Sequence, residues 1–354
     1  MTDITRRDLF KYRIKRRFRQ VVFGLGFDVA RPGTGSDRTG GDLPTRGHAS
    51  FVLTRQPATR KPLDIRPDTD GGQSAFAACM DWLSRGQVIL AAIAPGRCRQ
   101  LWWYDLATGS PFTLTVRCLI RDGAAAAAAL LQSFYDAYQP SSAAARLGLD
   151  GGNGPLHACG PLAAPMPWSM DGPAAIERKQ RLASYDKNRR EGNRRWSYGT
   201  LVGPASPAFA RFQVDKFRQL LHSFDRRGYT RHKGFDGDIR GVLLVDDRAD
   251  DPAWCVRLDC GGNHRAAVLA AQGTDAIPVR LFPENVIRRS EAGTWPLVSA
   301  GVFTRDEAES VFRRVLEADP PVAWSPPPHL VSPSGSAFHT CDAGAAGGAS
   351  VPGG

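Results

Sequence analysis

The feature that most constrains this chain is a succession of short elements in its last third. Two apolar segments, 239–246 (IRGVLLVD) and 254–259 (WCVRLD), have the composition of strands. The second ends in a glycine-rich turn, which an alanine-rich helix over 264–272 follows. A further apolar segment, 277–282 (IPVRLF), predicts another strand. This order predicts a mixed α/β unit in which the glycine turn lies between the carboxyl end of a strand and the start of a helix.

Helices are predicted on both sides of this unit. The segment 207–227 carries apolar residues at helical spacing, and Gly228 follows in position to cap its end. Thr304 and Glu307 have the spacing of a capping box at the start of a later helix. That helix has an apolar face of Ala308, Val311, Phe312 and Val315. These signals together delimit a domain.

The part of the chain before this domain also mixes helices and strands. A helical face ends at Gly86, and the alanine run 124–129 leads into a second helix. Strands are predicted at 87–94, 100–106 and 112–120. The whole chain is therefore predicted to be α+β. Its expected organisation is a basic N-terminal helix and linker (1–48), an α+β domain of undetermined role (49–149), a Pro/Gly-rich and basic connector (150–197), the mixed α/β domain (198–318) and a disordered tail (319–354).

The net charge of +11 suits a polyanionic partner. Much of it lies in two clusters, 6–19 and 178–195. Residues 8–23 predict a basic amphipathic helix, which would bind nucleic acid or an anionic membrane surface. The alternative is a helix packed on its own protein with its arginines in solvent. Both interpretations stay open.

The cellular compartment is predicted from the length of the apolar runs and from the number and spacing of the cysteines. No apolar run reaches the roughly 18 residues that a membrane-spanning helix needs. The seven cysteines are odd in number and contain no CxxC pair, which argues against a disulfide framework. We therefore expect a cytoplasmic protein without a transmembrane segment.

The glycine turn carries the candidate site. Gly261 and Gly262 permit a positive φ and a close approach of the backbone, and Asn263 is a good N-cap residue. His264 and Arg265 follow in the first helical turn, where free N–H groups and the helix dipole favour an anion. The five residues predict a phosphate-binding turn. The alternative is a strand–turn–helix corner in which the glycines serve geometry and the His–Arg pair is solvated.

Asp259, at the end of the second predicted strand, is a candidate metal ligand. Asp259 would hold Mg²⁺ beside bound phosphates, or it simply ends its strand. Cys260 lies on the strand side of the turn and is not expected to act in its place.

Three segments of this region, LLHSFDRRGY, IRGVLLV and CVRLDCGGNHRAAVLAAQGTDAIPVRL, resemble the ParB/sulfiredoxin superfamily. The resemblance covers residues 211–282 and implies a nucleotide whose phosphates bind the glycine-plus-basic motif. Members include CTP-dependent DNA-partitioning clamps, ATP-using sulfiredoxins and a free-serine kinase. It assigns the phosphate-holding roles to Gly262, His264 and Arg265.

Two departures from the superfamily narrow the expected activity. Asn263 stands where sulfiredoxin has its catalytic cysteine, so repair of sulfinic acids is not expected. The partition proteins carry Glu-Arg-Arg after the glycine where this chain has Asn-His-Arg, and no helix-turn-helix module clearly follows residue 282. Chromosome partitioning is therefore not expected either.

Two functions remain open. The first is an enzyme that binds a nucleoside triphosphate (ATP or CTP) with Mg²⁺ and transfers or hydrolyses a phosphoryl group, with His264 and Arg265 in the catalytic roles. The second is a non-catalytic module that binds nucleotide or nucleic acid. A carboxylate brought to the turn would favour the enzyme, and the candidates are Glu177, Asp186, Glu191, Asp215 and Asp236. The sequence predicts neither the acceptor substrate nor the oligomeric state.

Overall fold

The structure is a computed structural model. It describes residues 27–30, 52–55, 62–66, 72–149, 151–190, 202–229, 238–258, 262–322 and 324–331, with 27–30, 52–55, 72–74 and 186–190 described by backbone alone. The predicted basic helix over 8–23 and most of the predicted N-terminal linker lie outside these residues. So do Asp259, Cys260 and Gly261 of the predicted turn.

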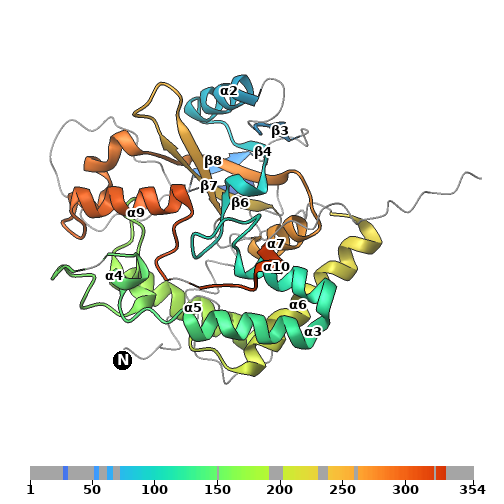
Figure 1. Ribbon diagram of the computed structural model, residues 1–354. Coiled ribbons are helices and arrows are strands. Elements are labelled where there is room, and N and C mark those ends of the chain that lie inside the picture. The colour runs from blue at the N-terminus through green and yellow to red at the C-terminus, as the bar shows by residue number, and fades with distance from the viewer. Residues whose placement is uncertain are drawn as a thin grey trace, which may run out of the picture.

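A six-stranded mixed sheet forms the centre of the fold, in the strand order β3-β4-β8-β6-β7-β5 (Figure 1). β6 and β8 are parallel, whereas β4 and β7, their outer neighbours, run antiparallel to them. The edge strands β3 and β5 are parallel to β4 and β7. A separate antiparallel pair comprises β1 and β2. The strands are β1 (Phe27–Ala30), β2 (Val52–Arg55), β3 (Leu63–Asp64), β4 (Ile89–Ile93), β5 (Cys98–Arg99), β6 (Ile239–Asp246), β7 (Ala253–Leu258) and β8 (Ile277–Arg288).

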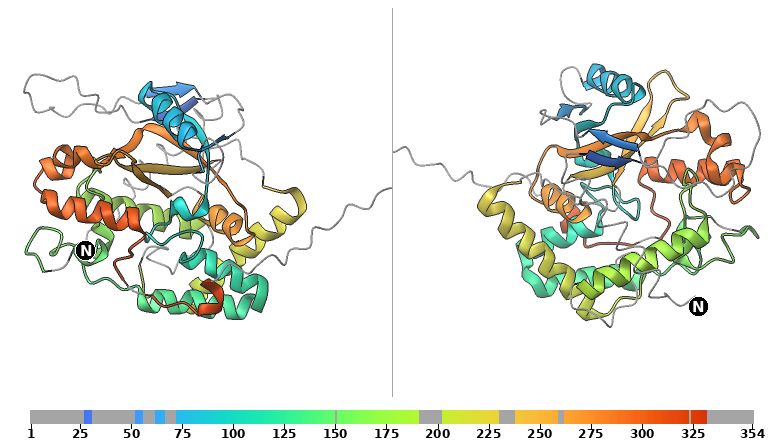
Figure 2. Two further views of the ribbon diagram at one scale, coloured as in Figure 1. Left: turned by 45° about the horizontal axis from the view of Figure 1, so that its top comes forward. Right: turned by 180° about the vertical axis from the view of Figure 1, so that it is seen from behind.

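Helices lie on both sides of this sheet (Figures 1 and 2). Two long helices, α3 and α6, run beside each other. The α-helices are α2 (Gly72–Ser84), α3 (Pro111–Ala137), α4 (Ala143–Arg146), α5 (Pro173–Arg190), α6 (Pro207–Arg227), α7 (Asn263–Ala271), α8 (Pro296–Ser299), α9 (Arg305–Glu317) and α10 (Pro328–Val331). Short 3₁₀ turns are η1 (Pro95–Arg97), η2 (Pro161–Ala163) and η3 (Arg289–Thr294). The α+β class predicted from the sequence is confirmed.

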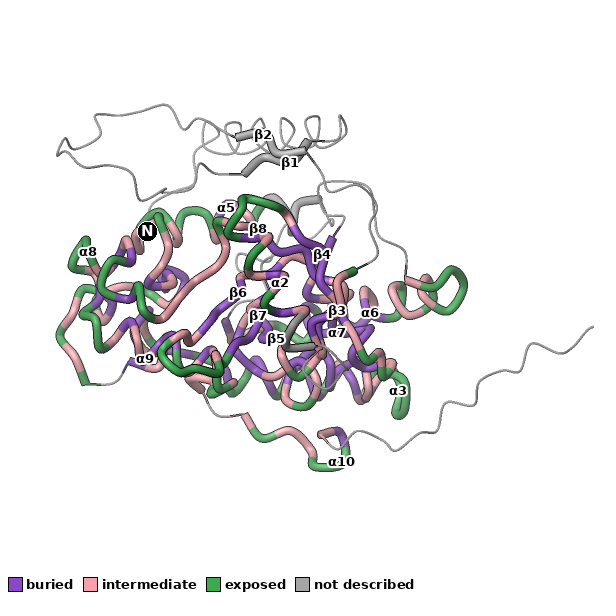
Figure 3. The backbone as a smooth tube through the Cα atoms, turned by 90° about the horizontal axis from the view of Figure 1, so that it is seen from above, coloured by how far each residue is buried: buried purple, intermediate pink, exposed green. Residues whose placement is uncertain are grey.

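Each face of the sheet has its own buried core. On the first, which we call the α7 face, alternate residues of β6 such as Leu243 and Val245 pack with α2 and α7. On the second, the α9 face, Leu244 and Cys255 pack with α9, where Val311, Phe312 and Val315 are buried. Figure 3 shows the buried residues concentrated in these central strands and in the helices beside them. A third core lies between α3, α6 and α7.

Strands from both of the ranges predicted as domains pair within this one sheet. β4, from the range 49–149, pairs with β8 from Ile89↔Leu281 to Ile93↔Ile277. β5, from the same range, pairs with β7. The ranges 49–149 and 198–318 therefore contribute to a common core, which includes α2 and α7.

Two predicted strands are wrong. Residues 112–120 form the first part of α3, where Ser110 caps the helix by accepting a hydrogen bond from the Thr113 N–H. Leu114 and Val116 alternate with Thr113 and Thr115 as in a strand, yet all four are fully buried. Because this helix segment is enclosed on several sides, the alternation does not reflect one buried and one exposed face.

The predicted strand 100–106 is also wrong. Apart from an isolated antiparallel bridge between Arg99 and Asp105, the segment forms turns. Trp102 packs in the core beside α3, while Trp103 packs on the α9 face with φ +68°. Consecutive tryptophans thus enter different cores, and the turn is the geometry that permits it.

The predicted disordered tail, 319–354, is wrong for its first part. The Tyr104 hydroxyl donates a hydrogen bond to the Val322 carbonyl, and Trp324 makes edge contacts with Tyr104 and Phe134. Leu330 in α10 is buried against α3 and α6. The proline-rich composition of this segment does not prevent single apolar side chains from packing on α3. Residues 332–354 lie outside the described part.

Candidate functional site

The first turn of α7 follows directly from the conformation of Gly262. This glycine is the N-cap residue, with φ +99°, and the helix begins at Asn263. The prediction that Asn263 is the N-cap is therefore wrong by one position. The N-cap residue, being a glycine, provides no side-chain hydrogen bond to the first N–H groups of the helix. Such groups form an anion-binding position at a helix N-terminus.

Gly262 is also pressed against the start of β6. A Cβ atom at this position would lie 2.9 Å from the Cα and 2.9 Å from the Cγ1 of Ile239. Both the positive φ and this close approach require glycine. The helix N-terminus is consequently fixed at the end of the sheet.

Asn263 points into the protein. Its side chain is 4% exposed, so it does not face solvent at the helix end. Of the predicted binding residues, Asn263 can therefore contribute through its backbone N–H rather than through its amide.

His264 is held between two helices. Its Nε2 lies 2.8 Å from Oε1 of Gln213 on α6. The imidazole ring also packs on Phe112 of α3 and Phe217 of α6, at centroid distances of 4.8 and 5.1 Å. With Gln213 Oε1 as the acceptor, the proton is on Nε2 and Nδ1 is the second hydrogen-bonding position of the ring. Packing against the range 49–149 restricts the space for a ligand at His264.

Arg265 is half-buried in the same first turn. It is the third residue of α7, in the turn at which an anion is favoured. The structure thus brings Gly262, the first N–H groups of α7, His264 and Arg265 together. It leaves Gly261 and the proposed metal ligand Asp259 outside the described residues.

The described carboxylates on α5 and α6 are engaged away from this turn. Glu177 on α5 accepts hydrogen bonds from Arg181, and Asp215 on α6 pairs with Arg218. The other three candidates, Asp186, Glu191 and Asp236, have side chains outside the described part. Within the part of the chain that the structure covers, no group of three or more His, Cys, Asp or Glu residues is arranged to hold a metal ion.

Gln213 is the site residue that the sequence analysis missed. It is fully buried on α6, four residues before Phe217, and both side chains reach His264. An amide at an otherwise apolar helical position next to Val214 and Phe217 was the available signal. A buried polar side chain needs a hydrogen-bond partner, and His264 supplies it.

A pocket lies near the opposite end of α7. Its volume is about 460 Å³, and it is lined by apolar residues including Phe224 and Leu269, with Tyr229 and Gln272 beside them. Pro278 of β8 and Ala92 of β4 complete one wall. This pocket does not include any residue of the first turn of α7, so it is distinct from the predicted phosphate site.

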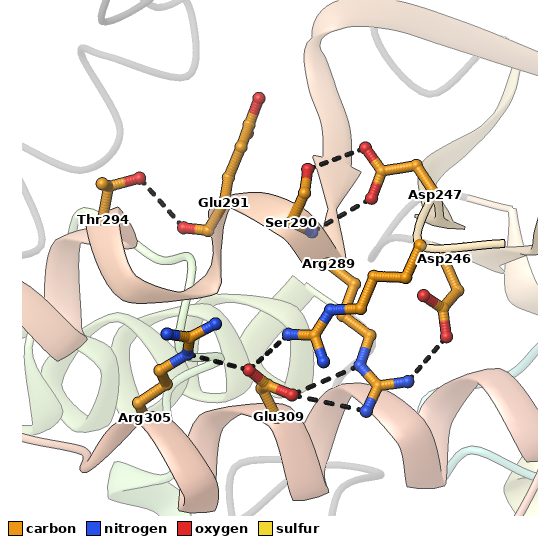
Figure 4. Close-up of polar contacts among 9 residues, drawn as sticks. Asp246, Asp247, Arg289, Ser290, Glu291, Thr294, Arg305 and Glu309 are labelled. Atoms are coloured by element: carbon orange, nitrogen blue, oxygen red, sulfur yellow. Dashed lines mark hydrogen bonds and ion pairs between the residues drawn. The ribbon is translucent and has the colours of Figure 1, made fainter.

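A network of ion pairs joins the end of the sheet to α9 (Figure 4). Glu309 accepts hydrogen bonds from Arg248, Arg305 and Arg289. Arg289 also pairs with Asp246 at 2.7 Å. These hydrogen bonds, that from Arg248 foremost, lower the pKa of Glu309 to about 2 against the opposing effect of burial. With its charges paired internally, the network links elements and is not a candidate catalytic centre.

Three comparisons, with protein-family models, with curated proteins and with solved structures, found no match to this chain. None of the described helices is long and apolar enough to cross a bilayer.

Proposed function

We propose that this protein is a nucleotide-binding, ParB/sulfiredoxin-like protein that holds the phosphates of ATP or CTP at the N-terminus of α7. The observation that carries the proposal is the uncapped first turn behind Gly262, whose φ of +99° and contact with Ile239 fix the helix end in place. Backbone N–H groups and the helix dipole favour a phosphate there. Arg265 in the same turn would add a charge-assisted, bidentate hydrogen bond.

The geometry supports nucleotide binding alone better than it supports phosphoryl transfer or hydrolysis. Phosphoryl transfer needs groups that orient the nucleophile and hold Mg²⁺. Glu177 and Asp215 are paired elsewhere, and His264 is packed between Phe112 and Phe217. The enzymatic version, with His264 and Arg265 in catalytic roles and Asp259 holding Mg²⁺, requires a carboxylate from the part of the chain that is not described.

The test is a nucleotide-binding titration with ATP, CTP, GTP and UTP, each with and without Mg²⁺. The wild-type protein should bind a nucleoside triphosphate, and Arg265→Ala should weaken binding about tenfold or more, because a hydrogen bond to a charged group contributes about 1.5–3 kcal/mol. Arg85→Ala is the matched control, since Arg85, directly after α2, is 66% exposed and pairs with Asp81.

Three outcomes separate the versions. Nucleotide binding that depends on Arg265, without release of phosphate, supports the binding module. Release of phosphate that is lost in His264→Ala supports the enzyme. Absence of binding to all four nucleotides by the wild-type protein contradicts the proposal.

A further inference from the structure

Arg257 is a half-buried arginine that projects from the α9 face of the sheet. Two residues earlier on β7, the Cys255 thiol lies 3.8 Å from the Val315 carbonyl of α9. Because side chains alternate along a strand, Arg257 lies on the same face as Cys255. This is the face opposite to α7.

The neighbouring arginine on β5 already has its partners. Arg99 is paired in register with Arg257 and donates hydrogen bonds to the carbonyls of Val315 and Leu316, at 3.1 and 2.9 Å. It also pairs with Asp105. Arg99 therefore secures the carboxyl end of α9 and is not available to a ligand.

Two further arginines lie on this face of the sheet. Val242 on β6 is opposite Arg257, and Arg240, two residues before Val242, is opposite Arg280 on β8. Arg280 forms a buried ion pair with Asp238, and the Arg240 guanidinium lies over the Phe282 ring, 5.6 Å from its centroid. We call Arg257, Arg240 and Arg280 the arginine row.

The hydrogen bonding of Arg257 is incomplete. Its Nε is buried, and nothing in the described part of the chain accepts a hydrogen bond from it. Leaving a charged donor buried without an acceptor is costly. An anion at this place would supply the missing acceptor.

We propose that Arg257, with Arg240 on the neighbouring strand, binds a phosphate group of a small-molecule ligand on the α9 face. The planar guanidinium presents its N–H groups in a fork that matches two oxygens of a phosphate. Arg257 and Arg240 lie on adjacent strands about 4.8 Å apart and are offset by two residues, about 7 Å, which suits one phosphate group or two linked ones. Arg280 is only 3% exposed and is paired with Asp238, so it does not contact the ligand itself.

This site is separate from the N-terminus of α7. Gly262 contacts Ile239, whose side chain lies in the core of the α7 face, whereas Arg240 points to the other side of the same strand. The two proposals therefore fail or succeed independently. Binding at the row does not depend on Arg265, and binding at α7 does not depend on Arg257.

The first test observes Arg257 directly. In protein labelled with ¹⁵N-arginine, the Nε–H signal of Arg257 is assigned by its loss in Arg257→Lys, and inorganic phosphate is then titrated at constant ionic strength. We expect a saturable shift of this signal that persists in Arg265→Ala. A signal that does not shift, or that shifts equally with chloride, overturns the proposal.

The second test measures affinity in the background of Arg265→Ala, which removes the side-chain contribution at α7. Arg257→Gln keeps a polar side chain and should bind phosphate about tenfold more weakly or worse. Arg85→Gln, a change at an exposed arginine directly after α2, should bind as its background does. Circular dichroism establishes that each variant is folded. Unchanged phosphate affinity in folded Arg257→Gln overturns the proposal, and so does an equal loss in Arg85→Gln.

Discussion

Two residues determine the geometry at the start of α7, one through its backbone and one through its side chain. Gly262 permits the turn that places the helix against β6. Gln213 reaches His264 from α6 and fixes the imidazole between Phe112 and Phe217. The sequence predicts that the glycine, the histidine and the arginine lie at the start of a helix. The burial of Asn263 and the contact with Gln213 were not predictable from it, because both depend on how α3 and α6 pack on α7.

Replacing Gly262 by alanine should destabilise the protein more than the same change at another left-handed glycine. At Gly262 the new Cβ meets the backbone of Ile239 at 2.9 Å, in addition to the strain of φ +99°. At Gly273, with φ +77°, nothing lies within 4 Å of the Cβ position, so Gly273→Ala is the matched control. The left-handed conformation alone costs about 1–2 kcal/mol for a residue with a Cβ.

Urea unfolding measures the difference. We expect Gly273→Ala to lose roughly 1 kcal/mol and Gly262→Ala at least about 1 kcal/mol more, because backbone at the contact point cannot rotate away. Equal losses in the two variants would show that the approach to Ile239 is relaxed at little cost.

The contact between Gln213 and His264 should appear as a coupling energy. Gln213→Leu and His264→Phe each break the hydrogen bond between their side chains, and His264→Phe retains a ring beside Phe112 and Phe217. Each single variant leaves a buried polar group without its partner, whereas the double variant leaves neither. We therefore expect the double variant to be more stable than the sum of the single changes predicts, by about 0.5–1.5 kcal/mol. Additive free energies of unfolding would contradict a net contribution from this hydrogen bond.

At the scale of elements, sequence-based prediction was accurate where clear boundary signals or an exposed face were present. β6, α6 and α9 were predicted within a residue or two, since each has clear boundaries, such as the capping box of Thr304 and Glu307. The first part of α3 was mistaken for a strand because Thr113 and Leu114 are both fully buried. Periodicity identifies an element when one face is exposed, and it loses that power when neighbours enclose the element.

Glu309 should make the attachment of α9 dependent on pH. Its pKa is held at about 2, below its ordinary value of 4.5, first by the hydrogen bond from Arg248 and then by those from Arg305 and Arg289. A lowered pKa in the folded protein stabilises it above the ordinary value. That contribution is lost as the pH falls from about 4.5 to about 2.

The measurement is urea unfolding of wild type and Glu309→Gln between pH 7 and pH 2.5. Near pH 7 we expect the variant to be less stable by roughly 1–2 kcal/mol, with the gap narrowing as the pH falls. Glu317→Gln, an exposed position at the end of the same helix, is the control and should show no such gap. A gap that is constant with pH would mean that the network acts through packing rather than through charge.

At the scale of the whole molecule, one sheet joins parts of the chain that are far apart in sequence. β4 and β5 lie more than a hundred residues before β6, yet they pair with β8 and β7. Ile93, Ile277 and Val279 are fully buried in the same core. Sequence periodicity describes elements and not their long-range pairing, so a division into domains at 150–197 followed from composition alone.

This shared sheet predicts that the second half of the chain does not fold by itself. In a fragment of residues 198–331, β8 would lose the pairing with β4 along Ile89–Ile93, and β7 would lose β5. The α7 face would also lose α2, whose Phe76 stacks on Trp254 at 4.8 Å. Exposing this much apolar surface and an unpaired strand edge removes more stability than a domain usually has, about 5–15 kcal/mol.

Urea unfolding followed by circular dichroism and by tryptophan fluorescence tests this prediction. The full chain should unfold in a single transition that coincides for both signals, because the α7-face core shares β6 and β7 with the α9-face core and α7 with the third core. The fragment 198–331 should show no cooperative transition of its own. A sigmoidal transition in the fragment would establish that the range 198–318 forms an independent domain, and that β4 and β5 dock onto a sheet that is already folded.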